Sequence, residues 1–228
     1  MKHILNLSIG SSRTSSSEVI RFENTTIRIT HLGIDFDADL FESVLRSHDG
    51  KCDAICISYM PPAVMLKKKK IQHEMFERID KAVKETPVFY GHNLRSIYMN
   101  WTIRKAMENG LFRCENANIL FVTGLALHDL AKSFESIALS CKFLDSWTYL
   151  RIPVVLNGTS ELEKCASLVA NHLATRPLRD QTYNQWRDRL FNRWYSNQIK
   201  NADIIVSPSV LLENIDLKFL KGKTLLLD

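Results

Sequence analysis

The sequence of 228 residues lacks most of the patterns that assign a function at once. No stretch approaches the ~18 apolar residues of a membrane span, and the N-terminal segment MKHILNLSIG has too short an apolar run for a signal peptide. No H-E-x-x-H, clustered Cys/His or G-x-S-x-G is present, so neither zinc hydrolysis nor serine-hydrolase chemistry is supported. These absences predict a protein that does not enter a membrane and has no metal site.

Paired cysteines are also missing. The five cysteines include no C-x-x-C pair and stand singly in apolar or helical segments. An odd count at such spacings fits neither a disulfide framework nor a zinc site. The pattern indicates reduced, buried thiols, and we expect a cytoplasmic protein.

A strong excess of one charge is missing as well. The formal net charge is +5 and the isoelectric point is about 8.9. This mildly basic balance favours anionic ligands but is too small to indicate nucleic acid. We therefore expect a small anionic or polar ligand and no nucleic-acid partner.

The sequence does contain short apolar runs that alternate with amphipathic helical patterns, which is typical of α/β proteins. We expect two Rossmann-like three-layer halves with mostly parallel sheets and a cleft between them. Residues 1–112 would form the first half and residues 113–228 the second. The first half would include a β-hairpin made by Val19–Phe22 and Ile27–Leu32.

Two helices carry specific expectations. The run Lys67–Lys70 is interpreted as the solvated start of a helix whose inward face begins with Ile71. A later helix runs from Leu94 to about Glu108 and is expected to bury its apolar stripe. The residues of that stripe are Leu94, Ile97, Tyr98, Trp101 and Ala106.

The stretch Ala117–Asp145 has the layout of a dinucleotide-binding βαβ unit: strand, glycine turn, helix, strand and terminal acid. In such units an acid about 20 residues past the first glycine bonds the ribose hydroxyls. Gly124 is that first glycine, but a full G-x-G-x-x-G would need glycine where Ala126 and Asp129 stand. The stretch therefore indicates the architecture more strongly than it indicates dinucleotide binding.

Loops that follow strands hold the candidate substrate residues, because α/β proteins bind ligands at the carboxyl ends of strands. Ser11, Ser12 and Arg13 follow the first strand, where backbone amides, hydroxyls and a guanidinium would hold a carboxylate or phosphate. The alternative is a mobile serine-rich loop. A second junction offers His92 as a general acid or base, and Asn93 and Arg95 as substrate contacts. Its alternative is a capped helix with a surface histidine.

The candidate cofactor residues are Gly124, His128, Asp145 and Ser207, which would bind NAD or NADP. For Asp145 the alternative is a surface residue that ends a strand. For His128 it is a side chain that only covers the turn.

A basic, aromatic helical pattern between Gln181 and Lys200 predicts a lid or a partner-binding element, and its alternative is a helix packed across the domains. A terminal strand at Lys223–Leu227 would expose unpaired backbone groups if it lies at a sheet edge. Through one of these two surfaces we expect either a homodimer or a docked C-terminal domain.

Seven segments together resemble a group of bacterial quinate/shikimate-type dehydrogenases. They are ILNLSIGSSR (4–13), HLGID (31–35), CDAICIS (52–58), TPVFYGHNL (86–94), NILFVTGLALHDLA (118–131), ADIIVSP (202–208) and KGKTLLLD (221–228). The resemblance implies a dehydrogenase-like protein with a nicotinamide cofactor and a small polar or anionic substrate. The sequence departs from the group at Tyr59–Pro62, where the group has glycines. The group also continues past its last strand, so we expect this chain to be either a piece of a longer protein, corresponding to the group's N-terminal portion, or a shortened relative.

Two other functions remain open. The segment NADIIVSPS (201–209) is also common in the second domain of nucleotide-sugar-dependent transferases. The incomplete glycine pattern and the absence of an unambiguous general base favour a non-catalytic Rossmann-like interaction module instead.

Overall fold

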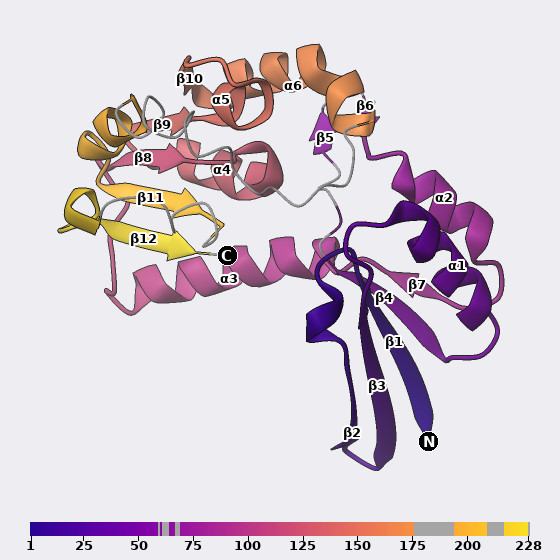
Figure 1. The fold of residues 1–228 in the computed structure, drawn as a ribbon. Helices are drawn as coiled ribbons and strands as arrows, with labels where there is room; N and C mark the ends of the chain where they lie inside the picture. Colours follow the sequence, from indigo (N-terminus) through magenta and orange to yellow (C-terminus); the bar gives the residue numbers. More distant parts are fainter. Residues whose placement is uncertain (59, 61–63, 67–68, 176–193, 209–216, 228) are drawn as a thin grey trace. The chain divides into compact units, whose positions relative to one another are not determined.

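The structure is a computed structural model that describes all residues except 59, 61–63, 67–68, 176–193, 209–216 and 228 (Figure 1). The chain forms two compact units, each with a five-stranded, mostly parallel sheet, so the protein is of the α/β class. Unit 1 comprises Met1–Ala63, Gln72–Arg95 and Ala174–Gln181, and unit 2 comprises Val64–Ile71, Ser96–Leu173 and Thr182–Asp228. The domain limits expected at residues 112 and 113 and the cleft expected between the halves stay predictions.

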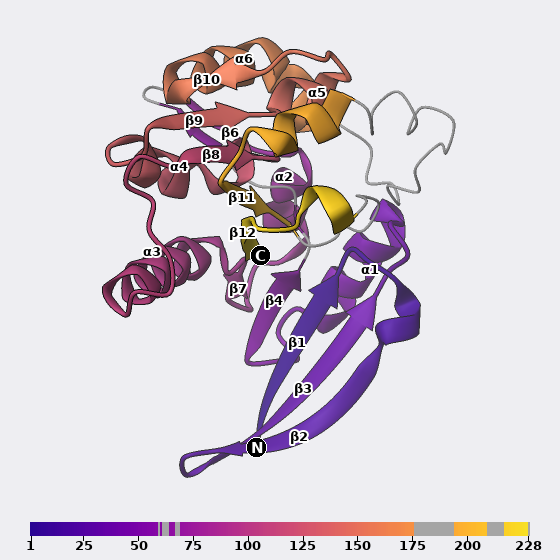
Figure 2. The ribbon, with the colours of Figure 1, turned by 90° about the vertical axis from the view of Figure 1, so that its left-hand side faces the viewer.

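The sheet of unit 1 has the strand order β2-β3-β1-β4-β7. Its strands are β1 (Lys2–Ser8), β2 (Ser16–Phe22), β3 (Thr25–Gly33), β4 (Ala54–Ser58) and β7 (Val88–Phe89). All neighbours pair in parallel except β2, which forms the predicted antiparallel hairpin with β3. Figure 2 shows β2 at the edge of this sheet.

Helices α1 (Ala38–His48) and α2 (Met75–Ala82) pack on the same face of that sheet. The β3-to-β4 and β4-to-β7 connections both move the same way across the sheet, and right-handed crossovers then place both helices on one side. The β1-to-β3 connection moves the opposite way and is made by the hairpin strand β2, not by a helix. The second face of the sheet therefore carries neither α1 nor α2.

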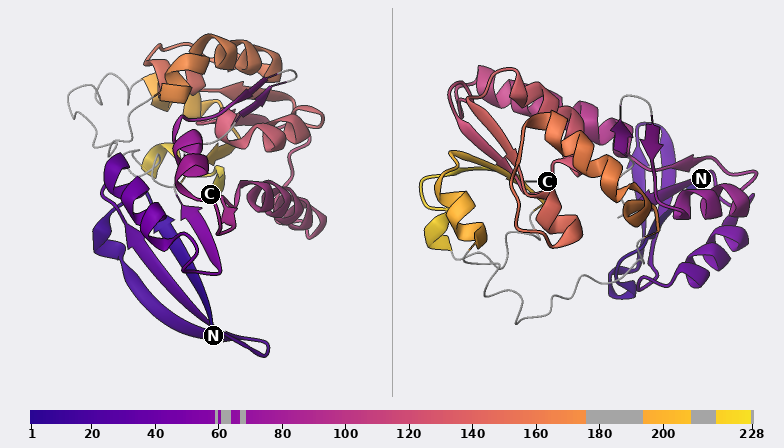
Figure 3. Two further views of the ribbon diagram at one scale, coloured as in Figure 1. Left: turned by 90° about the vertical axis from the view of Figure 1, so that its right-hand side faces the viewer. Right: turned by 90° about the horizontal axis from the view of Figure 1, so that it is seen from above.

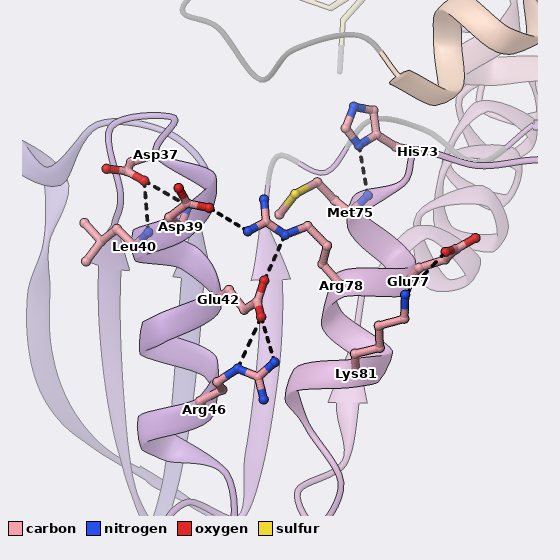
Figure 4. Close-up of polar contacts among 10 residues, drawn as sticks. All are labelled: Asp37, Asp39, Leu40, Glu42, Arg46, His73, Met75, Glu77, Arg78 and Lys81. Carbon is pink, nitrogen blue, oxygen red and sulfur yellow. Dashed lines mark hydrogen bonds and ion pairs between the residues drawn. The ribbon is translucent and has the colours of Figure 1, made fainter.

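A set of ion pairs connects side chains of α1 and α2 (Figure 4). The Arg78 guanidinium donates to Glu42 Oε2 at 2.9 Å and to Asp39 Oδ1 at 2.7 Å. Arg46 contacts the other oxygen of Glu42 at 2.7 Å. The hydrogen bonds from Arg46 and Arg78 hold the pKa of Glu42 below its ordinary value. Asp37 caps the start of α1 by accepting hydrogen bonds from two backbone amides.

The sheet of unit 2 has the order β10-β9-β8-β11-β12, and only β10 is antiparallel. Its strands are β8 (Asn118–Phe121), β9 (Ser140–Phe143), β10 (Leu156–Asn157), β11 (Ile204–Ser207) and β12 (Thr224–Leu227). Its helices are α3 (His92–Glu108, from Ser96 onward), α4 (His128–Glu135), α5 (Asp145–Leu150) and α6 (Gly158–Thr175), and residues 194–200 are also helical.

Helices cover both faces of this second sheet, and the layers can be followed in Figure 3. On one face, Phe121 and Phe143 stack at 5.2 Å between ring centroids and pack with residues of α4 and α6. On the other face, Leu120 and Val122 pack against Tyr195 of the helical segment 194–200. The central strands β8 and β11 therefore have both of their faces buried, which explains why they are continuous apolar runs in the sequence.

The lysine run does not start a helix. Lys69–Ile71 is a strand, β6, which pairs antiparallel with β5 (Val64–Leu66), and α2 begins only at Met75. Lys67 and Lys68 lie outside the described residues. Ile71 packs in the core of unit 2, so that tertiary contact overrides the helical spacing in the sequence.

Helix α3 forms as predicted, but the expected buried face is wrong. Met99, Ile103 and Met107 pack against the core of unit 2. The expected core residues are instead exposed, by 70% at Leu94, 68% at Ile97, 61% at Tyr98 and 49% at Trp101. The helix carries apolar residues on two sides, and periodicity alone does not show which side is buried.

The predicted partner surfaces are described only in part. Most of Gln181–Lys200 lies outside the described residues, but the Trp194 ring lies against Trp147 in a tilted arrangement, with 5.8 Å between ring centroids. The predicted terminal strand is β12, which lies at the edge of its sheet.

The helices in the described part of the chain are too short or too polar to cross a bilayer.

Candidate functional site

The carboxyl ends of the central strands of unit 1 meet at one edge. Because β1, β3 and β4 run parallel, their register places Ser8 beside Gly33 and Ser58. In α/β proteins ligands bind outside such an edge. The predicted substrate loop, Gly10 to Arg13, follows β1 at this edge.

The backbone amides of Ser12, Arg13 and Thr14 in that loop are already used within the protein. Ser11 caps a single 3₁₀ turn, Ser12–Thr14, and its hydroxyl accepts a hydrogen bond from Arg13 N. Ser12 N donates to Asp35 Oδ1 at 2.8 Å, and Thr14 N donates to Ser11 O. Hydrogen bonds from Ser12 hold the pKa of Asp35 below its ordinary value. An anionic ligand would therefore meet side chains here, above all the exposed Arg13, because the amides are occupied.

The turn between β3 and α1 is strained. Asp35 and Phe36 follow each other with φ of 49° and 63°, a left-handed backbone that residues other than glycine adopt at a cost of about 1–3 kcal/mol each. Two hydrogen bonds hold the turn in place, from Asp35 N to Gly10 O and from Phe36 N to Ile9 O, both 2.9 Å long. The β1 loop therefore imposes the conformation of the β3–α1 turn.

Gly33 fits the same junction only as glycine. A Cβ built on Gly33 would lie 2.0 Å from Ser11 O, which is far inside contact distance. The two loops are thus in direct backbone contact. Strained backbone of this kind gathers at functional sites, where the surrounding structure overrides local preference.

A line of side-chain hydrogen bonds crosses the sheet toward the loop. Ser58 Oγ lies 2.7 Å from Asn6 Oδ1, and Asn6 Nδ2 lies 3.0 Å from His31 Nδ1. His31 Nε2 lies 3.3 Å from Thr14 Oγ1, which is 2.8 Å from Ser11 O. The line joins three strands to the candidate ligand loop and places an imidazole at the edge.

Sequence reasoning does not select His31, Asn6 or Ser58. Each lies inside a strand or at its end, where a polar side chain is usually explained by exposure. The usable signal is the position of all three within the last three residues of parallel strands. Only the register between the strands brings them together.

At the second predicted ligand-binding junction, the structure describes only the backbone of the candidate residues. His92, Asn93 and Arg95 lie in the first turn of α3, and their side chains are outside the described residues. The catalytic role of His92 and the substrate contacts of Asn93 and Arg95 stay predictions.

The structure brings Asp145 and Gly124 of unit 2 together. The Asp145 carboxylate has no exposed surface and accepts hydrogen bonds from Gly124 N at 2.7 Å and Leu125 N at 2.8 Å. Burial raises the pKa of Asp145 to about 7, against the opposite effect of these hydrogen bonds. A Cβ on Gly124 would lie 2.2 Å from the Phe143 ring, so this glycine serves close packing of the turn on β9.

The other two predicted cofactor residues are also enclosed. His128 is 7% exposed, and its Nε2 lies 3.4 Å from Glu163 Oε1. Burial lowers the pKa of His128. Ser207 has no exposed surface, and its hydroxyl donates to Pro208 O.

These contacts bear on the expected nicotinamide cofactor. A ribose needs free carboxylate oxygens on the acid, and a pyrophosphate needs free amides in the glycine turn. Here the carboxylate of Asp145 and the amides of Gly124 and Leu125 satisfy each other. As arranged, these residues do not fit the cofactor in the predicted way. The described residues also contain no group of three or more His, Cys, Asp or Glu that would hold a metal ion.

The fold and this site define an α/β protein with two parallel-sheet units and a strained, polar carboxyl edge in unit 1. Residues 93–228 match the family described as Domain of unknown function (DUF8754), and the chain belongs to that family. Residues 3–90 match a second family, Domain of unknown function (DUF8753). No curated protein matches the sequence.

Two solved structures show distant similarity. An aspartate transcarbamoylase from Trypanosoma cruzi, in complex with carbamoyl aspartate and phosphate, is 10% identical with a TM-score of 0.38. The match covers 91% of this chain and 59% of that one, so this chain spans little more than half of the enzyme's length. A dipicolinate synthase chain from Bacillus halodurans is 13% identical with a TM-score of 0.34, over 100% of this chain and 89% of that one. At these TM-scores neither similarity bears on function.

Proposed function

We propose that this chain binds a small polar or anionic ligand at the carboxyl edge of unit 1. The observation that carries the proposal is the pair of left-handed residues Asp35 and Phe36, held by hydrogen bonds to the β1 loop. Such strain persists only where the surroundings impose it, and it is concentrated at binding and active sites. The position agrees with the general rule for ligand binding in parallel sheets.

The side chains at this edge suit an anion. Arg13 is exposed and supplies a guanidinium that pairs with a carboxylate or phosphate. The hydroxyls of Ser12 and Thr14 and the imidazole of His31 are further hydrogen-bonding groups in or beside this loop. The mild excess of positive charge also favours an anionic partner.

Binding can be measured by thermal unfolding in a panel of small anions that includes phosphate, malate and citrate. A ligand about 100-fold above its dissociation constant stabilises the folded state by about 2.7 kcal/mol, enough to raise the melting temperature by about 5 °C or more. Arg13→Ala should abolish that shift. Arg21→Ala is the matched control, because Arg21 is an exposed arginine of β2 in the same unit. If no anion stabilises the wild type, or if both variants respond alike, the proposal fails.

A dehydrogenase-like oxidoreductase is the second candidate. It is favoured by the strand order of unit 2, in which β9 and β11 flank β8, as in the central strands of a Rossmann-like sheet. The direction of the chain across the sheet reverses between β8 and β11. The carboxyl ends of these two strands would be the place for NAD or NADP, which would have to be held by groups other than the Asp145 carboxylate and the amides of Gly124 and Leu125. Calorimetric titration with both cofactors decides the matter, and absence of heat at millimolar concentration removes this candidate.

Two further expectations stay proposals. The expectation of a reducing, cytoplasmic compartment is supported by the five free cysteines, of which three are buried. Homodimer formation is supported by the edge position of β12 and by the exposed apolar residues of α3. A monomer in light scattering at tens of micromolar would exclude the dimer.

A further inference from the structure

The direction of the hydrogen bonds along the line from Ser58 to Ser11 can be followed from its last member. The carbonyl oxygen of Ser11 can only accept a hydrogen bond, so Thr14 gives its single hydroxyl proton to that oxygen, 2.8 Å away. Thr14 Oγ1 then has only acceptor capacity left for His31 Nε2, 3.3 Å away. In this arrangement His31 carries its proton on Nε2.

The same reasoning continues through the imidazole to the central strand. A neutral histidine with its proton on Nε2 has a lone pair on Nδ1, which needs a donor. Asn6 Nδ2 supplies that donor at 3.0 Å. The other end of the Asn6 amide, Oδ1, then accepts from the Ser58 hydroxyl at 2.7 Å. The side-chain orientations in the structure therefore satisfy the whole line, with the Asn6 amide nitrogen turned toward His31.

We propose that His31 Nε2–H donates a hydrogen bond to the ligand of this edge, and that Asn6 is the positioning residue that keeps the proton on Nε2. The ligand presents an acceptor oxygen of a carboxylate, phosphate or carbonyl group in the place that Thr14 Oγ1 occupies here. This inference rests on the proposed function, because it names the ligand chemistry of the same site. It excludes His31 as a base that removes a proton through Nε2.

Thr14 is suited to give way to such an oxygen. It lies in a 3₁₀ turn of three residues on the exposed loop, and none of the residues of that turn is buried. His31, by contrast, is half-buried and held in β3 by strand pairing on both sides. Rotation of the exposed Thr14 side chain would make room for the ligand oxygen while His31 stays in place. Arg13, beside Thr14, supplies the positive charge that an anionic oxygen needs.

The tautomer can be observed directly with long-range ¹H–¹⁵N correlation spectra of the imidazoles at pH about 8.5, where ordinary histidines are neutral. We expect the Nε2–H pattern for His31 in the wild type. Asn6→Asp replaces the amide donor by a carboxylate, which can only accept, so the proton of His31 should move to Nδ1. Asn24→Asp in the exposed β2–β3 turn is the matched control and should leave the pattern unchanged. If Asn6→Asp does not fold, Ser58→Ala frees the amide to turn over and should give a mixture of tautomers.

Ligand chemistry is tested with inorganic phosphate as the probe. Phosphate should shift the Nε2 resonance of His31 in the wild type and in Asn24→Asp, and this shift should be lost in Asn6→Asp. A wild type with the proton on Nδ1, or an Asn6→Asp variant that keeps it on Nε2, overturns the inference even when anions bind. If the tautomers are as expected but phosphate does not shift the Nε2 resonance, the proposed ligand chemistry is overturned. The melting temperatures of the wild type and of Arg13→Ala with anions test the proposed function separately.

Discussion

The carboxylate of Asp145 accepts a hydrogen bond from the backbone N–H of Gly124 at 2.7 Å, and so closes the β8–α4 turn from inside the protein. A carboxylate occupies the position in which a nucleotide-binding turn would offer its amides to a phosphate. The acid that the sequence suggests as a ribose ligand is therefore part of the internal support of unit 2.

The buried state of Asp145 predicts a specific pH dependence of stability. Its pKa is raised from the ordinary value of 3.8 to about 7, so between these values the folded state keeps a proton that the unfolded chain has lost. The contribution of Asp145 to the free energy of unfolding therefore falls as pH rises through this window, by at most about 1.4 kcal/mol per pH unit, and levels off above it. Asn at this position does not titrate. Urea unfolding should show Asp145→Asn gaining stability relative to the wild type as pH rises from about 4 to about 7. Parallel pH profiles would contradict this assignment.

A side chain at Gly124 should lower the stability of unit 2. Its φ is −70°, so any cost of Gly124→Ala comes from contact and not from backbone strain. The new methyl group would lie 2.2 Å from the Phe143 ring and 3.0 Å from Leu162, and overpacking of this kind costs about 1–3 kcal/mol. Denaturant unfolding should show that loss, and Phe143→Leu in the same chain should recover part of it. Additive losses would show that the ring is not the obstacle.

Residues Ile97 and Ile103 test which side of α3 is buried. Ile103 packs against the core of unit 2, so Ile103→Ala should lower the free energy of unfolding by about 1–3 kcal/mol. Ile97 is 68% exposed, so Ile97→Ala should change it by no more than about 0.5 kcal/mol. The two substitutions remove the same atoms from one helix and differ only in burial. Equal losses would mean that the outer side of α3 is also covered in solution.

The ion pairs of Arg78 should contribute little to stability and should depend on salt. Its partner Asp39 is 93% exposed and Glu42 is 25% exposed, so solvent screens both interactions. Arg78→Met should cost under about 1 kcal/mol at low salt and less at high salt. Lys81→Met is the control, because the Lys81–Glu77 pair is 3.9 Å long with both side chains about three-quarters exposed, and it should show no measurable loss. A salt-independent loss for Arg78→Met would indicate lost packing instead.

The sequence predicts elements better than contacts. The hairpin of β2 and β3, the helix α3 and the mostly parallel strands of both units follow from apolar periodicity and turn residues, which are local properties. The lysine run misleads because Lys69–Ile71 pairs with Val64–Leu66, and such pairing depends on a partner elsewhere in the chain. The buried side of α3 is not predictable in this way because both of its sides are apolar and only tertiary packing chooses between them.

The candidate site is predictable only as far as its loop. Ser11 to Arg13 follow a strand, and that position is visible in the sequence. His31 and Asn6 meet only because β1 and β3 pair in one particular register. Asp145 stands out as a strand-terminal acid, but its inward direction depends on the glycine turn it supports. Residue spacing carries none of this cross-strand geometry.

The central claim, that the carboxyl edge of unit 1 is the ligand site, is tested most directly by backbone amide NMR during titration with the anion panel. We predict saturable shifts that are largest at Ser12, Arg13, Thr14, His31 and Asp35 and that disappear in Arg13→Ala but not in Arg21→Ala. Shifts that gather instead in unit 2, or no saturable shift with any anion, would contradict the account.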